Sequence, residues 1–94
     1  MKEIKLGLCR GRHEIPDVEG YIYPQNLDPV NVDGIQQRAY DVLYSNGDDW
    51  QLSLYVTGLT VALVAVIKAC RERDIPLTLY HYNRETGEYY PQTV

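Results

Sequence analysis

The stretch that decides the fold lies in the middle of the chain and reads Gln51-Leu52-Ser53-Leu54-Tyr55-Val56-Thr57-Gly58-Leu59-Thr60. Its first part alternates the apolar residues Leu52, Leu54 and Val56 with polar or tyrosine side chains, the period-2 pattern of a strand with one buried face. Gly58 then permits a tight turn, and an apolar run follows at once. The stretch therefore predicts a strand that passes through a tight turn into a long helix.

We expect that helix to run from about Leu59 to Arg73, with no polar stripe before Lys68, since Thr60 is the only polar residue ahead of it. A helix that is apolar all round is usually buried all round. One side should therefore pack on the sheet, and another on a second subunit or on the first helix. On this basis we predict a homodimer.

Three further elements are predicted before the central stretch. Residues 4–9 alternate apolar and polar side chains, which predicts a strand. Residues 14–30 contain three prolines and cannot hold a long helix, so we expect an extended excursion with a short strand at 21–23. A helix capped by Asn31 or Asp33 should then run to about Ser45.

The chain after the second helix predicts a strand at 77–83 and a hairpin turn at 84–87. Residues 88–94 can return antiparallel, and Pro91 confines that strand to the edge of the sheet. Strands and helices that alternate make βαβ units with a parallel sheet. The expected fold is a single α/β domain over residues 1–94: a small Rossmann-like, three-stranded parallel core (β-α-β-α-β) with a C-terminal hairpin edge strand and the 14–30 excursion.

Each of the three predicted core strands has one apolar face and one polar or tyrosine-bearing face. A sheet covered by helices on both faces would instead have continuous apolar strands. We therefore expect both helices on one face, and Tyr55, Tyr80 and Tyr82 on the other, as an interface or a stacking surface. The chain has nine Tyr and no Phe, which suits a half-wet face, because Tyr carries a polar tip.

Composition excludes several classes of protein. A net charge of −4 argues against binding duplex nucleic acid through a basic face. Cys9 and Cys70 have no CxxC spacing, which predicts inert thiols in a reduced, cytoplasmic protein without a zinc site or a disulfide framework. The longest apolar run, residues 59–67, is too short to span a membrane. We expect no metal and no cofactor, since the chain lacks metal-ligand spacing and the G-x-G-x-x-G and Walker A motifs.

A phosphate site is the functional hypothesis that the strand ends favour. Ligands of open α/β sheets bind at the carboxyl ends of the parallel strands, where helix amino termini attract anions. The turn offers Thr57, Gly58, Leu59 and Thr60 there, and the end of the first strand adds Arg10-Gly11-Arg12-His13, the most basic window in the chain. The alternatives are an ordinary helix cap at Thr57, and an exposed basic turn that pairs with Glu14 and Asp17.

The residues from Tyr55 to Leu63, with Ile75 to Tyr80 after the helix, resemble the late strand, Thr-Gly turn, helix and strand of CRISPR-associated Rossmann-fold (CARF) domains. The resemblance implies that the turn contacts the phosphates of a cyclic oligoadenylate across a homodimer. Some small members of the family are ring nucleases that act without metal. If this chain is one, His13 is the implied general acid or base. The pattern differs at Leu59 and Val61, where the family often has Gly and Lys, and the whole chain is also similar to small proteins of phages and mobile elements.

Two hypotheses therefore stand, and whether the protein is an enzyme stays open between them. The first is a nucleotide-binding protein that holds a phosphate-bearing ligand, such as a cyclic oligonucleotide, at the strand ends, as a sensor, a sponge or a ring nuclease. The second is a protein-interaction module or phage-type inhibitor with no small-molecule ligand. It would use the tyrosine face of the sheet and the 14–30 excursion.

Overall fold

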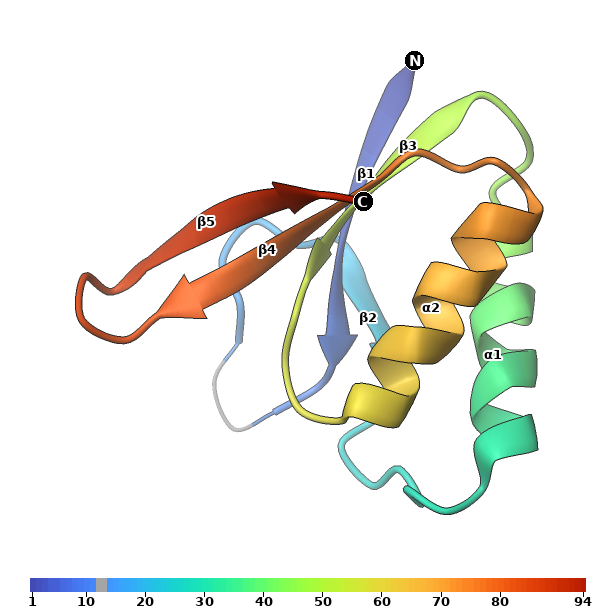
Figure 1. The fold of residues 1–94 in the computed structure, drawn as a ribbon, viewed down its shortest axis with the longest axis horizontal. Coiled ribbons are helices and arrows are strands. Elements are labelled where there is room, and N and C mark those ends of the chain that lie inside the picture. The colour runs from blue at the N-terminus through green and yellow to red at the C-terminus, as the bar shows by residue number, and fades with distance from the viewer. Residues whose placement is uncertain (12–13) are drawn as a thin grey trace.

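The computed structural model describes residues 1–11 and 14–94 as an α/β domain of five strands and two helices (Figure 1). Arg12 and His13 lie outside the described residues. In chain order the elements are β1 (Lys2–Cys9), β2 (Gly20–Tyr23), α1 (Val32–Tyr44), β3 (Trp50–Tyr55), α2 (Thr60–Glu72), β4 (Leu77–Asn83) and β5 (Glu88–Thr93). The strand–turn–helix predicted for the central stretch is confirmed.

The five strands form one mixed sheet in the order β2-β1-β3-β4-β5. β1 pairs in parallel with both β2 and β3, and β3 pairs in parallel with β4. β5 is antiparallel to β4 at the edge, as the hairpin turn and Pro91 predicted. The expected core of three parallel strands is not confirmed, because a fourth parallel strand, the short strand of the excursion, joins the sheet beside β1. That pairing links strands separated only by residues 10–19, and the residues described in this stretch, 10–11 and 14–19, include no helix.

Helix α1 begins where its cap residue was expected. The side chain of Asn31 accepts a hydrogen bond from the N–H of Gly34 at 3.2 Å, which satisfies one of the free donors of the first turn. The helix ends before Gly47, whose φ of 75° is easily adopted only by glycine. Its buried face consists of Ile35, Ala39 and Leu43.

Helix α2 packs against α1 through small residues, because Ala65 and Ala69 allow the two backbones to approach closely. The Gln36 amide donates to the carbonyl of Ala65 at 2.9 Å, and the Tyr44 hydroxyl donates to that of Ala69 at 3.0 Å. As expected, α2 packs on the sheet with one side and on α1 with another, and a further side is exposed in the single chain. Val64 is 49% exposed, since its side of the helix faces neither the sheet nor α1.

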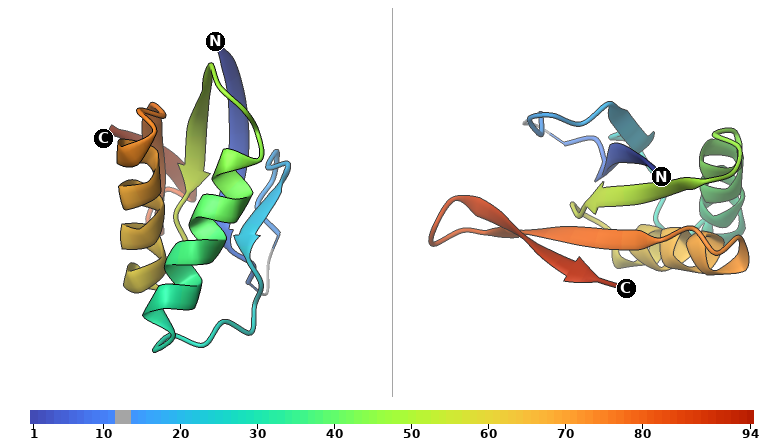
Figure 2. Two further views of the ribbon diagram at one scale, coloured as in Figure 1. Left: turned by 90° about the vertical axis from the view of Figure 1, so that its right-hand side faces the viewer. Right: turned by 90° about the horizontal axis from the view of Figure 1, so that it is seen from above.

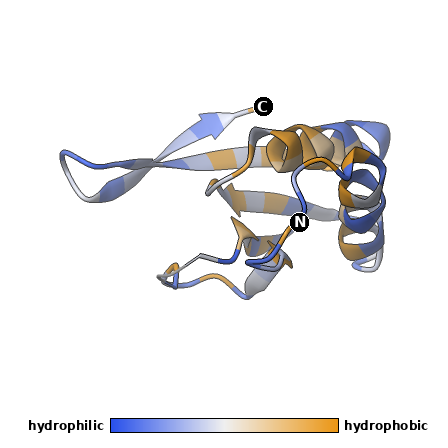
Figure 3. Ribbon diagram, turned by 90° about the horizontal axis from the view of Figure 1, so that it is seen from below, coloured by the Kyte–Doolittle hydropathy of each residue, from blue (hydrophilic) through white to orange (hydrophobic). Residues whose placement is uncertain are grey.

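Both helices lie on one face of the sheet, as the alternation of the strands predicted (Figure 2). The apolar residues of the central strands and of α2 meet there, with Leu8, Leu54 and Val66 fully buried (Figure 3). The β4–β5 hairpin projects beyond the helices, and its tip is polar. His81 lies on the helix side of this hairpin, half-buried, with its ring 2.8 Å from the Gln92 amide oxygen. Across residues 1–11 and 14–94, neither helix has the length and hydrophobicity needed to cross a membrane.

Candidate functional site

The face of the sheet without helices carries a row of aligned residues. The strand register places Tyr21, Gly7, Tyr55 and Tyr80 side by side on β2, β1, β3 and β4. Directly opposed residues of neighbouring strands point to the same face of a sheet. Four adjacent strands thus contribute three tyrosines and one glycine to a single line across this face.

Gly7 makes room for the first tyrosine of the row. A Cβ atom at this position would lie 2.5 Å from two ring carbons of Tyr21 and 3.2 Å from a methyl carbon of Ile15. The Tyr21 hydroxyl also accepts a hydrogen bond from the N–H of Ile15 at 2.8 Å. The start of the excursion is therefore held against the sheet, with Ile15 only 8% exposed.

The other tyrosines pack on one another around Tyr55. Its ring stacks on Tyr80, with centroids 4.9 Å apart and planes inclined by 12°, and meets Tyr89 edge-on at 5.0 Å. The ring of Tyr82 lies 5.2 Å from that of Tyr89 and is 52% exposed. Burial, and then the neighbouring Tyr hydroxyls, raise the pKa of Tyr89 above its usual value.

These rings form one wall of an open groove of about 750 Å³. Residues 14–17 of the excursion also line the groove, and two of them, Glu14 and Asp17, are exposed acidic residues. Gly11, Thr57 and Gly87 complete the lining. The groove thus combines aromatic faces with negative charge, and no Lys or Arg of the described residues lines it.

The structure places the predicted phosphate residues in different surroundings. Arg10 does not point into the groove: its guanidinium carbon lies 4.5 Å above the ring centroid of Tyr21. Gly11 lines the groove next to it. Arg12, and the proposed catalytic His13, are outside the part of the chain that the structure describes.

Thr57 is tied to the end of β1. Its hydroxyl donates to the carbonyl of Cys9 at 2.8 Å and accepts from the N–H of the same residue at 3.1 Å. Gly58 has a φ of 75°, and a Cβ atom there would lie 3.8 Å from the sulfur of Cys9. This angle confirms the prediction that Gly58 is a tight-turn residue, because glycine adopts a positive φ without steric cost.

Leu59 is the cap residue of α2 and makes no side-chain hydrogen bond to the first turn. Its backbone hydrogen bond to Cys9 favours the thiolate, but burial has the larger effect and raises the pKa of the Cys9 thiol. Thr60 is exposed at the first position of the helix. Thr57 lines the groove, whereas Gly58, Leu59 and Thr60, the other three residues of the turn, do not.

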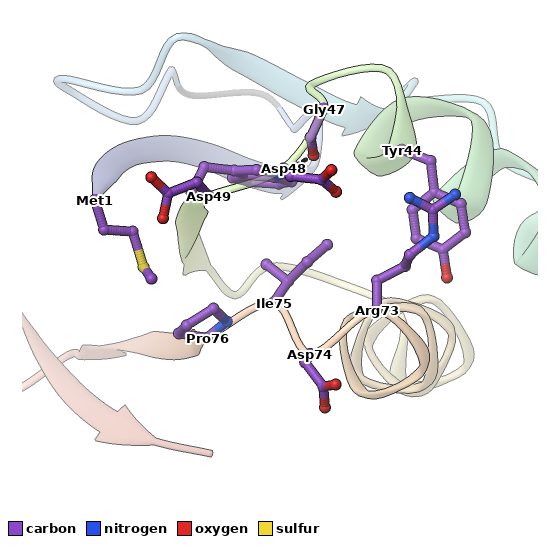
Figure 4. Close-up of a pocket in the computed structure, with 10 residues that line it drawn as sticks. Met1, Tyr44, Gly47, Asp48, Asp49, Arg73, Asp74, Ile75 and Pro76 are labelled. Atoms are coloured by element: carbon purple, nitrogen blue, oxygen red, sulfur yellow. Dashed lines mark hydrogen bonds between the residues drawn. The ribbon is translucent and has the colours of Figure 1, made fainter.

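A second, smaller cavity of about 70 Å³ lies at the other end of the sheet (Figure 4). Asp48, Asp49 and Asp74 surround it, and Arg73 lies with its guanidinium carbon 4.2 Å from the ring centroid of Tyr44. The Trp50 indole N–H donates to the carbonyl of Gly47 at 3.0 Å. The volume suits one or two water molecules, and the described residues include no group of three or more His, Cys, Asp or Glu arranged to hold a metal ion.

Sequence reasoning identified Tyr55, Tyr80 and Tyr82 as residues of the open face, and the structure brings all three into the groove. Sequence reasoning missed Tyr89 and Ile15, which line the groove. It also missed Tyr21 and Gly7, which lie beside the groove. Tyr89 could have been found from the hairpin, because it lies directly opposite Tyr82 across the predicted turn. Tyr21 could not, since its position depends on the unexpected pairing of β2 with β1.

The chain was compared with protein-family models, curated proteins and solved structures, and none of the three comparisons gives a match. The function is therefore argued from the groove and the turn themselves.

Proposed function

We propose that this protein is an interaction module whose open sheet face binds a segment of another protein. The observation that carries the proposal is the groove in which four tyrosines, Tyr55, Tyr80, Tyr82 and Tyr89, line one side of about 750 Å³ of open space. Tyrosine is enriched at protein interfaces because its ring buries a large apolar area while its hydroxyl tolerates water. The rings already pack against one another, so little side-chain entropy is lost on binding.

Three features of the groove favour a protein segment over a phosphate-bearing nucleotide as its ligand. Glu14 and Asp17 repel an anion. The Thr57 hydroxyl already donates to the carbonyl of Cys9. Arg10 is stacked on Tyr21 and does not line the groove.

The connectivity supports a Rossmann-like description of the central part of the sheet. β1, β3 and β4 are parallel neighbours, α2 connects the last two, and α1 lies in the connection that leads to β3. In such sheets the carboxyl ends of the strands are the usual binding edge. The groove includes Thr57, just beyond the end of β3, and so reaches this edge.

A second candidate function follows from the start of α2. Leu59 offers no side-chain cap and Thr60 is exposed, so the first backbone N–H groups of this helix can accept an anion. A phosphate-bearing nucleotide, including a cyclic oligonucleotide, would bind there in a sensor, sponge or ring nuclease. A thermal-shift panel of cyclic and linear nucleotides tests this candidate: no stabilisation near about 1 mM ligand contradicts it.

The interaction proposal is tested by panning random peptides displayed on phage against the purified protein. Tyr82 and Tyr90 make a matched pair for this test, because they are 52% and 51% exposed on opposite faces of the same hairpin. We expect peptides to be enriched on the wild type and on Tyr90→Ser, and to be lost on Tyr82→Ser. Enrichment that depends on neither tyrosine, or no enrichment at all, would overturn the proposal.

A further inference from the structure

We propose that the segment bound in the tyrosine groove presents arginine, with its guanidinium flat on the tyrosine rings and its charge matched by Glu14 and Asp17. This inference rests on the interaction function proposed above and names the chemistry of the partner. Guanidinium groups are attracted to aromatic faces within about 6 Å by the ring quadrupole. The groove supplies both the faces and the opposite charge.

The protein itself shows this pairing on the same face. Arg10 lies 4.5 Å above the ring centroid of Tyr21, and Tyr21 stands in the cross-strand row with Tyr55 and Tyr80. Only Gly7 separates Tyr21 from Tyr55 in that row. The sheet therefore already holds one arginine against the first tyrosine of the row, and the groove lies over the tyrosines on the other side of the glycine.

A second arginine of the chain also lies against a tyrosine ring, outside the groove. Arg73 lies 4.2 Å from the ring centroid of Tyr44, at the end of the helical layer. The tyrosines of the groove have no such partner among the described residues, since no Lys or Arg lines it. Tyr82, which is 52% exposed, presents the ring of this cluster that a cation from another molecule reaches most easily.

Charge favours a cationic occupant over other partners. Two carboxylates line the groove and the chain carries a net charge of −4, so a basic segment is attracted both at contact and at longer range. Arginine suits the site better than lysine, because its planar guanidinium stacks on a ring and still offers N–H groups in its own plane to a carboxylate.

The experiment is an NMR titration of the ¹⁵N-labelled protein with the capped peptide acetyl-Gly-Arg-Gly-Arg-Gly-amide. The control peptide carries citrulline at both arginines, which keeps the planar shape and removes the charge. We expect shifts confined to residues of the groove, and affinity for the arginine peptide about fivefold or more above that for the citrulline peptide. Equal shifts with both peptides at about 5 mM, or shifts outside the groove, would overturn the inference.

Matched charge variants separate a local effect from general attraction to an acidic protein. Glu14→Gln with Asp17→Asn removes two charges from the groove, and Asn is tolerated at the positive φ of Asp17. Asp41→Asn with Asp48→Asn removes two exposed charges outside the groove lining. Only the first pair should reduce the preference for arginine over citrulline, to the part that the tyrosine rings supply. Equal losses with the two pairs would mean non-specific attraction and would contradict the inference.

The displayed peptides distinguish failure of this inference from failure of the function on which it rests. If peptides selected by the wild type and lost on Tyr82→Ser contain no arginine, the interaction function stands and the arginine proposal is wrong. If no peptide depends on Tyr82, both are wrong. Selected peptides that contain arginine, and lose binding when it is replaced by citrulline, support both.

Discussion

The hydroxyl of Thr57 makes both of its hydrogen bonds with the backbone of Cys9: it donates to the carbonyl at 2.8 Å and accepts from the N–H at 3.1 Å. A side chain at the end of β3 thus replaces the backbone pairing that would otherwise continue along β1. Thr57, the first residue of the Thr-Gly turn, therefore holds the ends of β1 and β3 together.

Thr57→Val should consequently destabilise the protein by about 1–3 kcal/mol, because a part-buried N–H and C=O of Cys9 both lose their partner. Thr57→Ser keeps the hydroxyl and should recover most of this loss. Thr60→Val, at an exposed position of the same turn, should change the free energy of unfolding by no more than about 0.5 kcal/mol. Urea denaturation followed by circular dichroism measures all three, and equal effects at Thr57 and Thr60 would contradict this role.

Gly7→Ala should destabilise the protein by about 1–3 kcal/mol, since the added Cβ would lie 2.5 Å from two ring carbons of Tyr21. Gly20→Ala is the matched control, because nothing lies within 4 Å of a Cβ at that strand position. Combining Gly7→Ala with Tyr21→Ala removes the clashing ring, so the two losses should not add. Strict additivity in a double-mutant cycle would show that the two residues are not in contact.

Stability should fall at alkaline pH because two buried acids have raised pKa values in the folded protein. Burial raises the pKa of Cys70 from 9.0 to about 12, and burial together with the nearby Cys9 thiol raises that of Tyr23 from 10.0 to about 12. The unfolded chain loses these protons first. The stabilisation is therefore complete below about pH 9 and is lost as the pH rises towards 12.

Chemical denaturation at a series of pH values checks this expectation. Cys70→Ala should flatten the part of the fall that begins near pH 9, while Tyr23, whose hydroxyl donates to the carbonyl of Ile35 at 2.7 Å, still titrates later. An unchanged pH profile in Cys70→Ala would mean that the thiol ionises equally easily in the folded and unfolded chains.

The predicted homodimer can be tested at Val64, the exposed apolar residue on the outer side of α2. If a second copy covers this side, Val64→Asp places a charge in the interface and should convert a dimer into a monomer. Thr86→Asp, which adds the same charge at an exposed position of the β4–β5 turn beyond the helices, is the control for charge alone. Light scattering at micromolar concentration reads the mass, and a wild-type monomer would remove the prediction.

The local pattern of the chain was sufficient to predict most elements. The alternation of Leu52 and Leu54, the cap at Asn31 and the hairpin before Pro91 each depend on neighbours in sequence, and each is confirmed. The same alternation also predicted that Tyr55 and Tyr80 share the face without helices. A period of two residues fixes the face of every side chain once one face is buried.

The pairing of β2 with β1 was decided only by the tertiary structure. Four residues within a proline-rich excursion carry too little pattern to specify a strand partner, so their place depends on the contact of Tyr21 with Gly7. The extent of burial of α2 was likewise undetermined, because composition cannot say which side of an apolar helix meets a neighbour.

The sequence by itself thus determined the order of the elements and the two faces of the sheet, since both follow from local periodicity. The tertiary structure decided which distant residues share a site. It placed the guanidinium of Arg10 over the ring of Tyr21, and it brought Glu14 and Asp17 into the same groove as the tyrosines. Such placements depend on strand register and on the path of the excursion, which are set by long-range packing.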